Sequence, residues 1–359
     1  MNYLPLEMYK NLEFYASILV FCISVVSNIL ALSFYKHYRE NGSTNPYIKM
    51  LWFQLSFDIF FAIVSIICRQ DEIIVPGYLT FHLANFDSFH LSRQIHGYII
   101  AMAFFAMYGN INNCTLVIIL RYIQSSGLIK LRNRHLFLAV FITLLIPGIL
   151  AFNLWNSFDY TLPANLVYLS DLKSGTVDPG MTINSISCSV PLKGPLFYIM
   201  MLGFFGYLGA NYILVVFIFF KYRQYFIKFS KSMSVSTRTI HQEFTRILAL
   251  QAFAPIIIAG LPIMAYLGSI FLDLNFRIGG TIILFLLSLT PACNGLLFVF
   301  LSSKNIKILK RRLSTLVNFI FCKNLVQVSP KISKVFHSTR VSTKKNAPST
   351  GPSAVHFNG

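Results

Sequence analysis

The sequence predicts an all-α protein, an integral membrane bundle of seven transmembrane helices. Apolar residues make up 55% of the 359-residue chain and charged residues only 12%, against about 25% charged residues in an ordinary soluble domain. So few charges exclude a soluble globule of this size, and 35 Phe and 18 Tyr residues exclude a disordered chain. Lipid, rather than water, is therefore the solvent of most side chains.

Seven apolar stretches supply the predicted helices, because a spanning helix needs about 20 mostly apolar residues. Lys49 and Asp58 are the only charged residues inside these stretches. Alternating segments of about ten residues, which are typical of a membrane β-barrel, are absent from the sequence. The stretches are residues 14–35, 47–68, 97–120, 136–155, 196–220, 247–270 and 278–301.

The seven stretches form one transmembrane domain, residues 14–301, after a short N-terminal segment, residues 1–13. Basic and apolar residues then interleave at helical spacing, which predicts an amphipathic helix on the membrane surface over residues 302–322. Cys322 at its end is either a palmitoylation site or an ordinary reduced thiol. Residues 323–359 are predicted to be a disordered, basic cytoplasmic tail.

The distribution of charge predicts the orientation. Most of the 30 Lys and Arg residues fall in segments 36–46, 121–135 and 221–246 and after residue 301, whereas most acids fall in the alternate segments. Because basic loops stay on the cytoplasmic side, we expect a multi-pass plasma-membrane protein with an extracellular N-terminus and a cytoplasmic C-terminus. The formal charge of +18 then reflects topology, with the anionic inner leaflet of the bilayer as counter-charge, and no nucleic-acid partner is expected.

Three polar residues at hydrocarbon depth are predicted to meet. Asp58 lies near the middle of the second span, while Asn28 and Asn294 lie nearer the inner ends of the first and seventh spans. An ionisable group in hydrocarbon costs roughly 2.5 to 3.5 kcal/mol, so it normally faces the bundle interior with a partner. The cluster is a hydrogen-bonded packing node, a water or ion site that biases the conformational state, or a direct ligand contact.

The third span is predicted to be central because it carries three amides that lipid would not tolerate. Asn110 and Asn113 share one helical face and Asn112 points elsewhere, so at least two neighbouring helices must supply partners. Arg121 and Tyr122 stand at the inner end of this span. A basic side chain there either tethers a neighbouring helix or reaches lipid phosphates.

Four prolines are predicted to kink their helices, because each removes a main-chain hydrogen bond. They are Pro147 in the fourth span, Pro255 and Pro262 in the sixth, and Pro291 in the seventh. Two kinks directly after the basic loop 221–246 suit a sixth helix whose cytoplasmic end moves. Proline is also common in static membrane helices, so both interpretations stay open.

Two of the six Cys residues lie in an oxidising location. Cys68 at the outer end of the second span and Cys188 in the long second outer loop are predicted to form a disulfide. The sequence contains no metal-ligand cluster, no glycine-rich phosphate loop and no nucleophile elbow. We therefore expect no cofactor, no bound metal and no enzymatic activity.

Three motifs carry a resemblance to a known family. Residues 233–255, MSVSTRTIHQEFTRILALQAFAP, join a basic loop to the sixth span, Leu120-Arg121-Tyr122 ends the third span, and Ser288-Leu289-Thr290-Pro291 lies in the seventh. With these motifs the chain resembles the nematode serpentine chemoreceptors, rhodopsin-like G-protein-coupled receptors of chemosensory neurons. The delta-like (srd) subgroup is the most similar, followed by the str and h (srh) subgroups. No acid precedes Arg121 and no Trp precedes Pro262, so the usual acid lock and toggle residue are not carried over.

The resemblance implies a chemosensory, olfactory-type receptor in sensory neuron cilia, which transduces binding of a small external molecule to a heterotrimeric G protein. The alternative function is a transporter or ligand-gated channel subunit, for which one membrane Asp is thin support. The candidates for G-protein coupling are Arg121, Tyr122, Arg238, His241 and Arg246. Aromatic candidates for the ligand pocket, for which packing or lipid-facing roles stay open, are Phe104, Phe105, Tyr198 and Tyr266.

Overall fold

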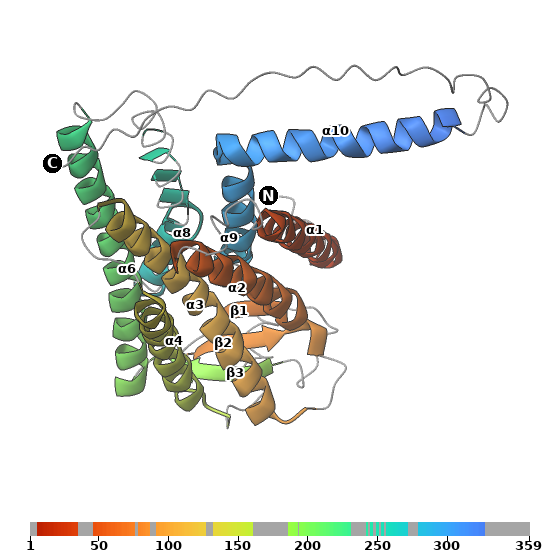
Figure 1. Ribbon diagram of the computed structural model, residues 1–359. Helices are drawn as coiled ribbons and strands as arrows, with labels where there is room; N and C mark the ends of the chain where they lie inside the picture. The colour runs from red at the N-terminus through yellow and green to blue at the C-terminus, as the bar shows by residue number, and fades with distance from the viewer. Residues whose placement is uncertain are drawn as a thin grey trace, which may run out of the picture. The chain divides into compact units, whose positions relative to one another are not determined.

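Most of the chain is described by the computed structural model (Figure 1). The described residues are 6–34, 46–75, 78–86, 91–126, 132–160, 186–192, 194–230, 256–271 and 279–326, with isolated helical positions between 242 and 254. The chain divides into two compact units, Met1–Ile308 and Leu309–Gly359, and each is described by itself.

Six of the described helices are long and apolar enough to cross a membrane. Each overlaps one of the predicted spans, because uninterrupted apolar side chains favour a helix that satisfies its own main-chain hydrogen bonds in lipid. They are α1 (Leu6–Ser33), α2 (Pro46–Cys68), α3 (Arg93–Ser126), α4 (Asn133–Asn156), α6 (Pro195–Phe229) and α9 (Gly279–Leu301).

The sixth predicted span is described as a continuous segment only from Ile256 onward. There a π-helix, η4 (Ile256–Gly260), leads directly into the short apolar helix α8 (Leu261–Phe271). Pro262 is the second residue of α8 and lacks the N–H of a regular α-helix, which fits the irregular turn before it. Pro147 and Pro291 lie inside the continuous helices α4 and α9, and Pro255 lies outside the described residues.

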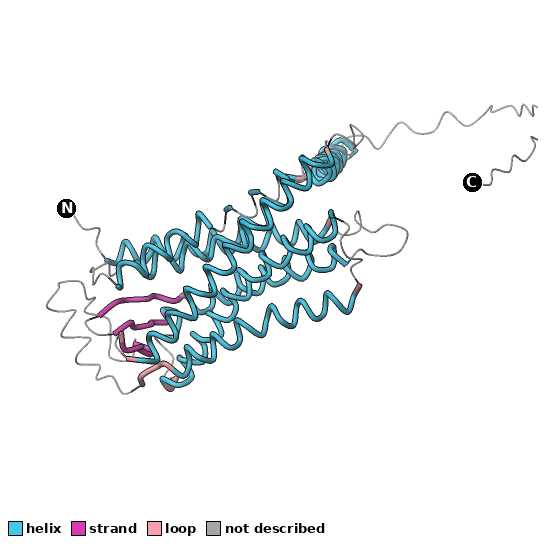
Figure 2. Tube along the Cα trace, turned by 90° about the vertical axis from the view of Figure 1, so that its left-hand side faces the viewer, coloured by secondary structure: helices cyan, strands magenta, loops and turns pink. Residues whose placement is uncertain are grey.

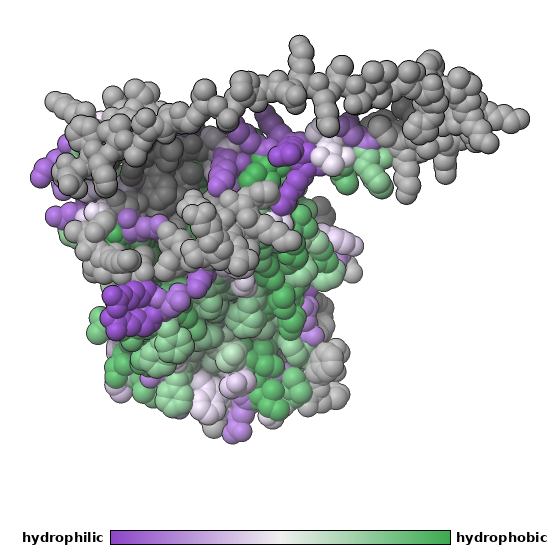
Figure 3. Space-filling view, viewed as in Figure 1, coloured by the Kyte–Doolittle hydropathy of each residue, from purple (hydrophilic) through white to green (hydrophobic). Residues whose placement is uncertain are grey.

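The helices form a membrane bundle in which α3 is the most buried. Figure 2 shows the helices running side by side, and α3 contacts α2, α4 and α6 while α1 contacts α2 and α9. Large apolar side chains such as Phe137 on α4 and Leu202 on α6 are each 76% exposed. Hydrophobic residues also cover much of the helical face that Figure 3 shows. Such an apolar exterior is suited to lipid and not to water.

A three-stranded antiparallel sheet that was not predicted from the sequence lies at one end of the bundle (Figures 1 and 2). The strands β1 (Gln70–Val75), β2 (Tyr78–Leu83) and β3 (Ile186–Pro191) are ordered β1-β2-β3, and a short 3-10 helix, η2 (Ala84–Phe86), follows β2. We call this end of the bundle the sheet end. All residues of β2 after Tyr78 are buried, so the sheet belongs to the packed core.

The sheet also corrects the predicted disulfide. Cys68 and Cys188 are both buried, and both are free thiols. Cys188 on β3 lies opposite Phe81 on β2, whereas Cys68 ends α2 just before β1, at the far edge of the sheet. The central strand β2 therefore separates the two strands near which the cysteines lie. Burial raises the pKa of the Cys188 thiol, which keeps it in the unreactive protonated form.

Helix α10 (Ser303–Val326) follows α9 after a single residue and covers the predicted surface helix. Lys307, Lys310 and Arg311 are exposed along it, and so are the apolar residues Leu313 and Leu316. A helix with one basic and one apolar face is suited to the boundary between lipid headgroups and acyl chains. Cys322 lies in this helix, but its side chain lies outside the described part.

Candidate functional site

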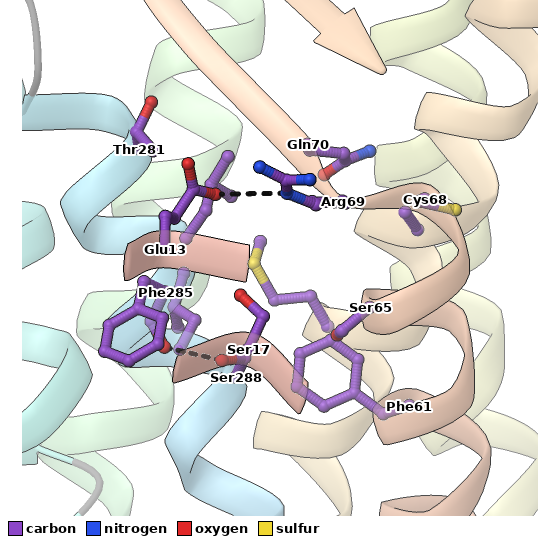
Figure 4. A pocket seen from close by; sticks show the side chains of 14 residues that line it. Glu13, Ser17, Phe61, Ser65, Cys68, Arg69, Gln70, Thr281, Phe285 and Ser288 are labelled. Atoms are coloured by element: carbon purple, nitrogen blue, oxygen red, sulfur yellow. Dashed lines mark hydrogen bonds and ion pairs between the residues drawn. The ribbon is translucent and has the colours of Figure 1, made fainter. Parts of the chain in front are cut away.

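A cavity lies at the sheet end, bounded by α1, α2, α3, α9 and the start of β1 (Figure 4). Its free space is about 60 Å³. One buried water needs about 10–15 Å³ in this measure, so the cavity admits several waters or one small molecule. Phe61, Met107 and Leu287 form part of its apolar wall. Its polar wall consists of Glu13, Ser17, Ser65, Arg69, Gln70, Thr281 and Ser288.

Arg69 joins α2 to β1 in a left-handed conformation, with a φ angle of 35°. Its N–H donates to the carbonyl oxygen of Ser65 at 2.9 Å, and its own carbonyl accepts from the N–H of Ala84 at 3.1 Å. A helix commonly ends in this conformation on glycine, because a side chain makes it strained. The chain therefore keeps a long cationic side chain at a position that favours glycine.

The Arg69 guanidinium forms an ion pair with Glu13 of α1 (Figure 4). Arg69 Nε lies 3.7 Å from Glu13 Oε1, and the two side chains are only 14% and 12% exposed. The guanidinium also lies over the ring of Phe14, 5.2 Å from its centroid. Water screens charges weakly at such a buried place. The pair therefore gives the cavity a strong local field without a net charge.

Four hydroxyl groups complete the polar wall. Ser17 comes from α1, Ser65 from α2, and Thr281 and Ser288 from α9. The Ser288 hydroxyl donates to the carbonyl oxygen of Phe285 at 2.6 Å. Because a hydroxyl both donates and accepts hydrogen bonds, this wall suits a polar ligand of either kind.

Glu72 of β1 is a second, buried acid at the sheet end. It lies opposite Phe81, which lies opposite Cys188, so these three side chains share one face of the sheet. A Cβ atom at Gly280 of α9 would lie 2.6 Å from the main-chain oxygen of Glu72 and 2.8 Å from the hydroxyl oxygen of Tyr266. Burial raises the pKa of the Glu72 carboxyl from 4.5 to about 7, although hydrogen bonding by Tyr266 lowers it in part.

An aromatic core lies beneath the sheet. Tyr108 of α3 stacks on Phe204 of α6 with ring centroids 5.0 Å apart. Phe104 stacks on the same Phe204 ring at 6.1 Å and meets Phe81 of β2 edge to face at 5.7 Å. The Tyr207 hydroxyl of α6 donates to the main-chain carbonyl of Tyr108 at 3.0 Å. This core fixes α3, α6 and the sheet to one another.

The predicted pocket aromatics do not line the sheet-end cavity. Phe104 and Tyr266 belong to the buried core. Phe105 is partly buried and meets Phe57 at a ring distance of 6.5 Å, whereas Tyr198 is 56% exposed on α6. In the structure these rings pack the core or lie exposed, and a role for them in ligand binding stays a prediction. Phe61 is a ring that does line the cavity.

A polar cluster around Asp58 contains two of the three residues predicted to meet, Asp58 and Asn294. The side-chain amide of Asn110 on α3 donates to Asp58 Oδ1. The Asn294 amide on α9 donates to the same oxygen at 3.3 Å and to Cys114 Sγ at 3.1 Å. Gln54 of α2 donates to the same sulfur atom at 3.2 Å. Three helices therefore converge on two acceptors.

Several oxygen atoms of this polar cluster receive no hydrogen bond from the described residues. They are Asp58 Oδ2, Asn110 Oδ1 and Gln54 Oε1, and all are buried. A buried acceptor without a donor is costly, and such groups commonly bind an internal water. Oxygen atoms are also the ligands that hard cations prefer. The cluster is thus chemically able to hold a water or a cation.

The remaining predicted amides act at separate places. Asn28 donates to the carbonyl oxygen of Pro291 on α9 at 2.9 Å, so it joins α1 to α9 and does not bind Asp58 directly. Asn112 points away from the cluster and donates to the carbonyl oxygen of Thr143 on α4 at 2.8 Å. The buried amide of Asn113 has no hydrogen-bond partner among the described residues. The amides of α3 thus face more than one neighbouring helix.

The predicted G-protein contacts are described only in part. Tyr122 is partly buried and packs against a cluster that contains Ile118 of α3 and Tyr222 of α6. Arg246 is exposed. Arg121 lies in α3 but its side chain lies outside the described part, as do Arg238 and His241. Tyr122 therefore contributes to the contact between α3 and α6 at the end of the bundle away from the sheet.

The residues predicted from the sequence do not include Glu13, Arg69, Glu72, Gln54 or Cys114. A lone basic residue directly after an apolar span is a signal for Arg69, but its partner lies one helix away and spacing does not reveal it. Cys114 lies inside an apolar span, yet its sulfur accepts hydrogen bonds from Gln54 and Asn294. Thiols are weak acceptors, so sequence alone gives little reason to expect this role.

A family profile described as serpentine type 7TM GPCR chemoreceptor Str matches residues 194–304. The match covers less than half of the chain and extends from the start of α6 to the start of α10. A comparison with curated proteins finds no match. The profile is that of the str subgroup, so the preference for the delta-like subgroup is not confirmed.

The matched segment assigns the chain a chemosensory receptor function of the G-protein-coupled kind. This is a receptor and not an enzyme. Its partners in general terms are a G protein and a small-molecule ligand, and its place is a membrane that the chain crosses several times. The match gives no support to the alternative of a transporter or channel subunit.

Proposed function

We propose that this chain is a Str-type chemoreceptor whose sheet-end cavity binds the external ligand. One observation carries this proposal: a largely buried ion pair, Arg69 with Glu13, lies beside four hydroxyls in a cavity at one end of a lipid-facing bundle. An apolar cavity with a few convergent polar groups is the usual form of a small-molecule site. The family match supplies the receptor class.

The sheet end is proposed to face the outside of the cell. Helix α6 begins close after β3 and carries Lys221, Arg223 and Lys228 toward its other end. Helix α4 likewise begins beside Arg132 and Arg134 and ends near the sheet, where Asp159 pairs with Ser189. Basic residues thus gather opposite the sheet, and such residues stay in the cytoplasm. A tag at Gly359 that antibodies reach on intact cells would contradict this orientation.

Two helices connect the cavity to the polar cluster. Met107 of α3 lines the cavity, and Asn110 follows it by about one helical turn. On α9, Thr281 and Ser288 line the cavity and Asn294 lies further along the same helix. A ligand that shifts α3 against α9 therefore changes the distances around Asp58. Binding favours the state in which these contacts fit the ligand best.

The end away from the sheet is proposed to contact the heterotrimeric G protein. Tyr122 lies there between α3 and α6, and Arg246 is exposed near the start of the sixth predicted span. Arg121, Arg238 and His241 complete the proposed surface on the basis of the sequence. A cationic surface attracts an acidic partner over a distance of about a Debye length. We also propose, from the resemblance to serpentine chemoreceptors, that the receptor lies in sensory neuron cilia.

The proposal is tested by expressing the full chain with a broadly coupling G protein and exposing the cells to a panel of small molecules. We expect a calcium or cAMP response that requires the G protein and that is lost in Arg69→Gln. Arg93→Gln, which removes an arginine that binds the Tyr160 carbonyl oxygen and does not line the cavity, is the matched control. No response across the panel at confirmed surface expression would overturn the proposal, and a current without any G protein would favour a channel.

A further inference from the structure

We propose that the sheet-end cavity selects a small zwitterion, a molecule that carries one carboxylate and one ammonium group. Arg69 binds the carboxylate and Glu13 binds the ammonium. This inference rests on the proposed function, which makes the cavity the ligand site, and it adds the chemical class of the ligand.

The first support is the charge balance of the cavity. Arg69 and Glu13 are both largely buried and form an ion pair whose Nε–Oε1 distance is 3.7 Å, longer than a hydrogen bond. Glu72, a buried acid of β1, does not line the cavity. A ligand with a single charge would leave that charge uncompensated in a poorly screened place. A zwitterion keeps the cavity neutral and replaces one ion pair by two.

The second support is the chemistry of the two anchors. A guanidinium presents its donors in a planar fork that matches a carboxylate with two parallel hydrogen bonds. The Phe14 ring, 5.2 Å from Arg69 Cζ, holds this group against one face. A carboxylate such as that of Glu13 accepts from the three N–H donors of an ammonium group. The Arg69 guanidinium and the Glu13 carboxylate thus provide one partner for each charged end of an amino acid.

The third support is the backbone of Arg69. Its φ angle of 35° lies in the left-handed region, where a residue other than glycine is strained. Its main chain forms the end of α2 through the bond to Ser65, and glycine would serve equally well for that bond. The structure therefore holds a strained arginine where its side chain reaches Glu13.

The fourth support is the size and lining of the cavity. About 60 Å³ of free space corresponds to about four to six water-sized groups at about 10–15 Å³ each. Glycine and alanine are molecules of this size. Ser17, Ser65 and Thr281 add hydroxyls that either charged group uses, and Phe61 and Met107 offer apolar contact to a short side chain.

The test uses the purified full-length receptor and follows its thermal unfolding with four probes at equal ionic strength: glycine, alanine, glycinamide and acetate. Glycinamide lacks the carboxylate and acetate lacks the ammonium. A ligand that binds only the folded state raises the unfolding temperature with its concentration. We expect glycine or alanine to do so at concentrations at least tenfold lower than either half-charged analogue. Stabilisation by acetate or glycinamide as strong as that by glycine would overturn the proposal.

Substitutions at Arg69 and Glu13 test whether these two residues bind the amino acid. We expect Arg69→Gln and Glu13→Gln each to weaken glycine or alanine binding at least tenfold, and Arg69→Lys, which keeps the charge without the fork, to retain part of it. Arg93→Gln and Asp159→Asn are matched controls, because neither residue lines the cavity, and binding should be unchanged. If Arg69→Gln does not fold, the comparison of the four probes on the wild-type chain still decides.

The experiments distinguish a failure of the zwitterion assignment from a failure of the proposed receptor function. If amino acids have no effect but another panel compound evokes a response that Arg69→Gln abolishes, the cavity remains the ligand site and the zwitterion assignment is wrong. If glycine or alanine binds at Arg69 and Glu13 but no G-protein response follows, the ligand class is supported and the receptor proposal fails.

Discussion

Asn28 of α1 donates a hydrogen bond to the main-chain carbonyl oxygen of Pro291 on α9, with an Nδ2–O distance of 2.9 Å. The same amide nitrogen also donates to the Ser24 carbonyl oxygen at 2.7 Å. Gly295, one helical turn after Pro291, has no side chain, and a Cβ atom there would come within 3.1 Å of Asn28 Cγ. Helices α1 and α9 therefore meet closely through one polar side chain and one glycine.

Replacing Asn28 by Leu is expected to destabilise this contact. The change removes the hydrogen bond to Pro291 and leaves a carbonyl oxygen buried next to an apolar group, which costs about 1 kcal/mol of the free energy of unfolding or somewhat more. Thermal unfolding of the purified protein in detergent measures it. Ile29→Ala is the control, because Ile29 is the next residue of α1 and is 54% exposed. An equal loss of stability in both variants would mean that the bond to Pro291 contributes nothing.

Two interpretations of the polar cluster around Asp58, a packing node and an ion site, predict different effects of Na⁺ on the stability of the protein. If the cluster is an ion site, the free energy of unfolding of the wild-type protein should be higher in Na⁺ than in an equal concentration of a large organic cation. The increase is RT ln(1 + [L]/Kd), where [L] is the Na⁺ concentration and Kd is the dissociation constant of Na⁺. Asp58→Asn should remove that difference, since it takes away the charge but keeps an oxygen atom for Asn110 and Asn294. The measurement is the unfolding temperature in the two salts. Equal unfolding temperatures for the wild type in both salts would support the packing node.

Much of the bundle was predictable because a helix that crosses lipid needs a long apolar stretch with few charges, and such stretches can be recognised in the sequence. The described helices overlap the predicted spans. The spacing of Asn110 and Asn112 on α3 predicted two different directions, and in the structure the first amide bonds to Asp58 and the second to Thr143. These features depend on one helix and its immediate neighbours. Local periodicity is enough to find them.

The sheet and the cavity were not predictable in the same way. Strands β1 and β2 have six residues each, and the Pro76-Gly77 dipeptide between them is a turn signal that seven long apolar stretches overshadow. Arg69 and Glu13 are 56 positions apart in the sequence, and only the packing of α1 beside α2 brings them together. The expected bridge between Cys68 and Cys188 was wrong for a related reason, since strand order decided which residues are neighbours.

The stability of the protein is expected to fall as the pH rises from about 4.5 to about 7, because of Glu72. Burial raises the pKa of this carboxyl from 4.5 to about 7, so between these pH values the folded protein holds a proton that the unfolded chain has released. The free energy of unfolding therefore decreases from about pH 4.5 to about pH 7, by up to about 3 kcal/mol at about 1.4 kcal/mol for each pKa unit.

Glu72→Gln should remove this pH dependence, because the amide does not titrate. Unfolding temperatures between pH 4.5 and pH 8 measure it for both proteins. Asp159→Asn, a change at another acid of the sheet end, should leave the slope in place. A wild-type stability that stays level over this range would show that Glu72 is ionised in the folded protein.

Gly280→Ala is expected to separate β1 from α9. A Cβ atom there would lie 2.6 Å from the main-chain oxygen of Glu72 and 2.8 Å from the Tyr266 hydroxyl oxygen. Main-chain atoms cannot turn aside as a side-chain end can, so the strand or the helix must shift, and overpacking of this kind costs about 1–3 kcal/mol. Thermal unfolding measures the loss.

Gly206→Ala on α6 is the matched control, because a Cβ atom there meets nothing within 4 Å. The same substitution should leave that helix as stable or stabilise it by up to about 1 kcal/mol, since alanine favours a helix. The difference between the two variants thus isolates the contact of β1 with α8 and α9 from the intrinsic helix preference.

Because Thr281 follows Gly280 and lines the cavity, Gly280→Ala should also weaken the ligand response, whereas Gly206→Ala should not. A Gly280→Ala protein as stable and as responsive as Gly206→Ala would mean that the contact of β1 with α8 and α9 contributes nothing to stability or response.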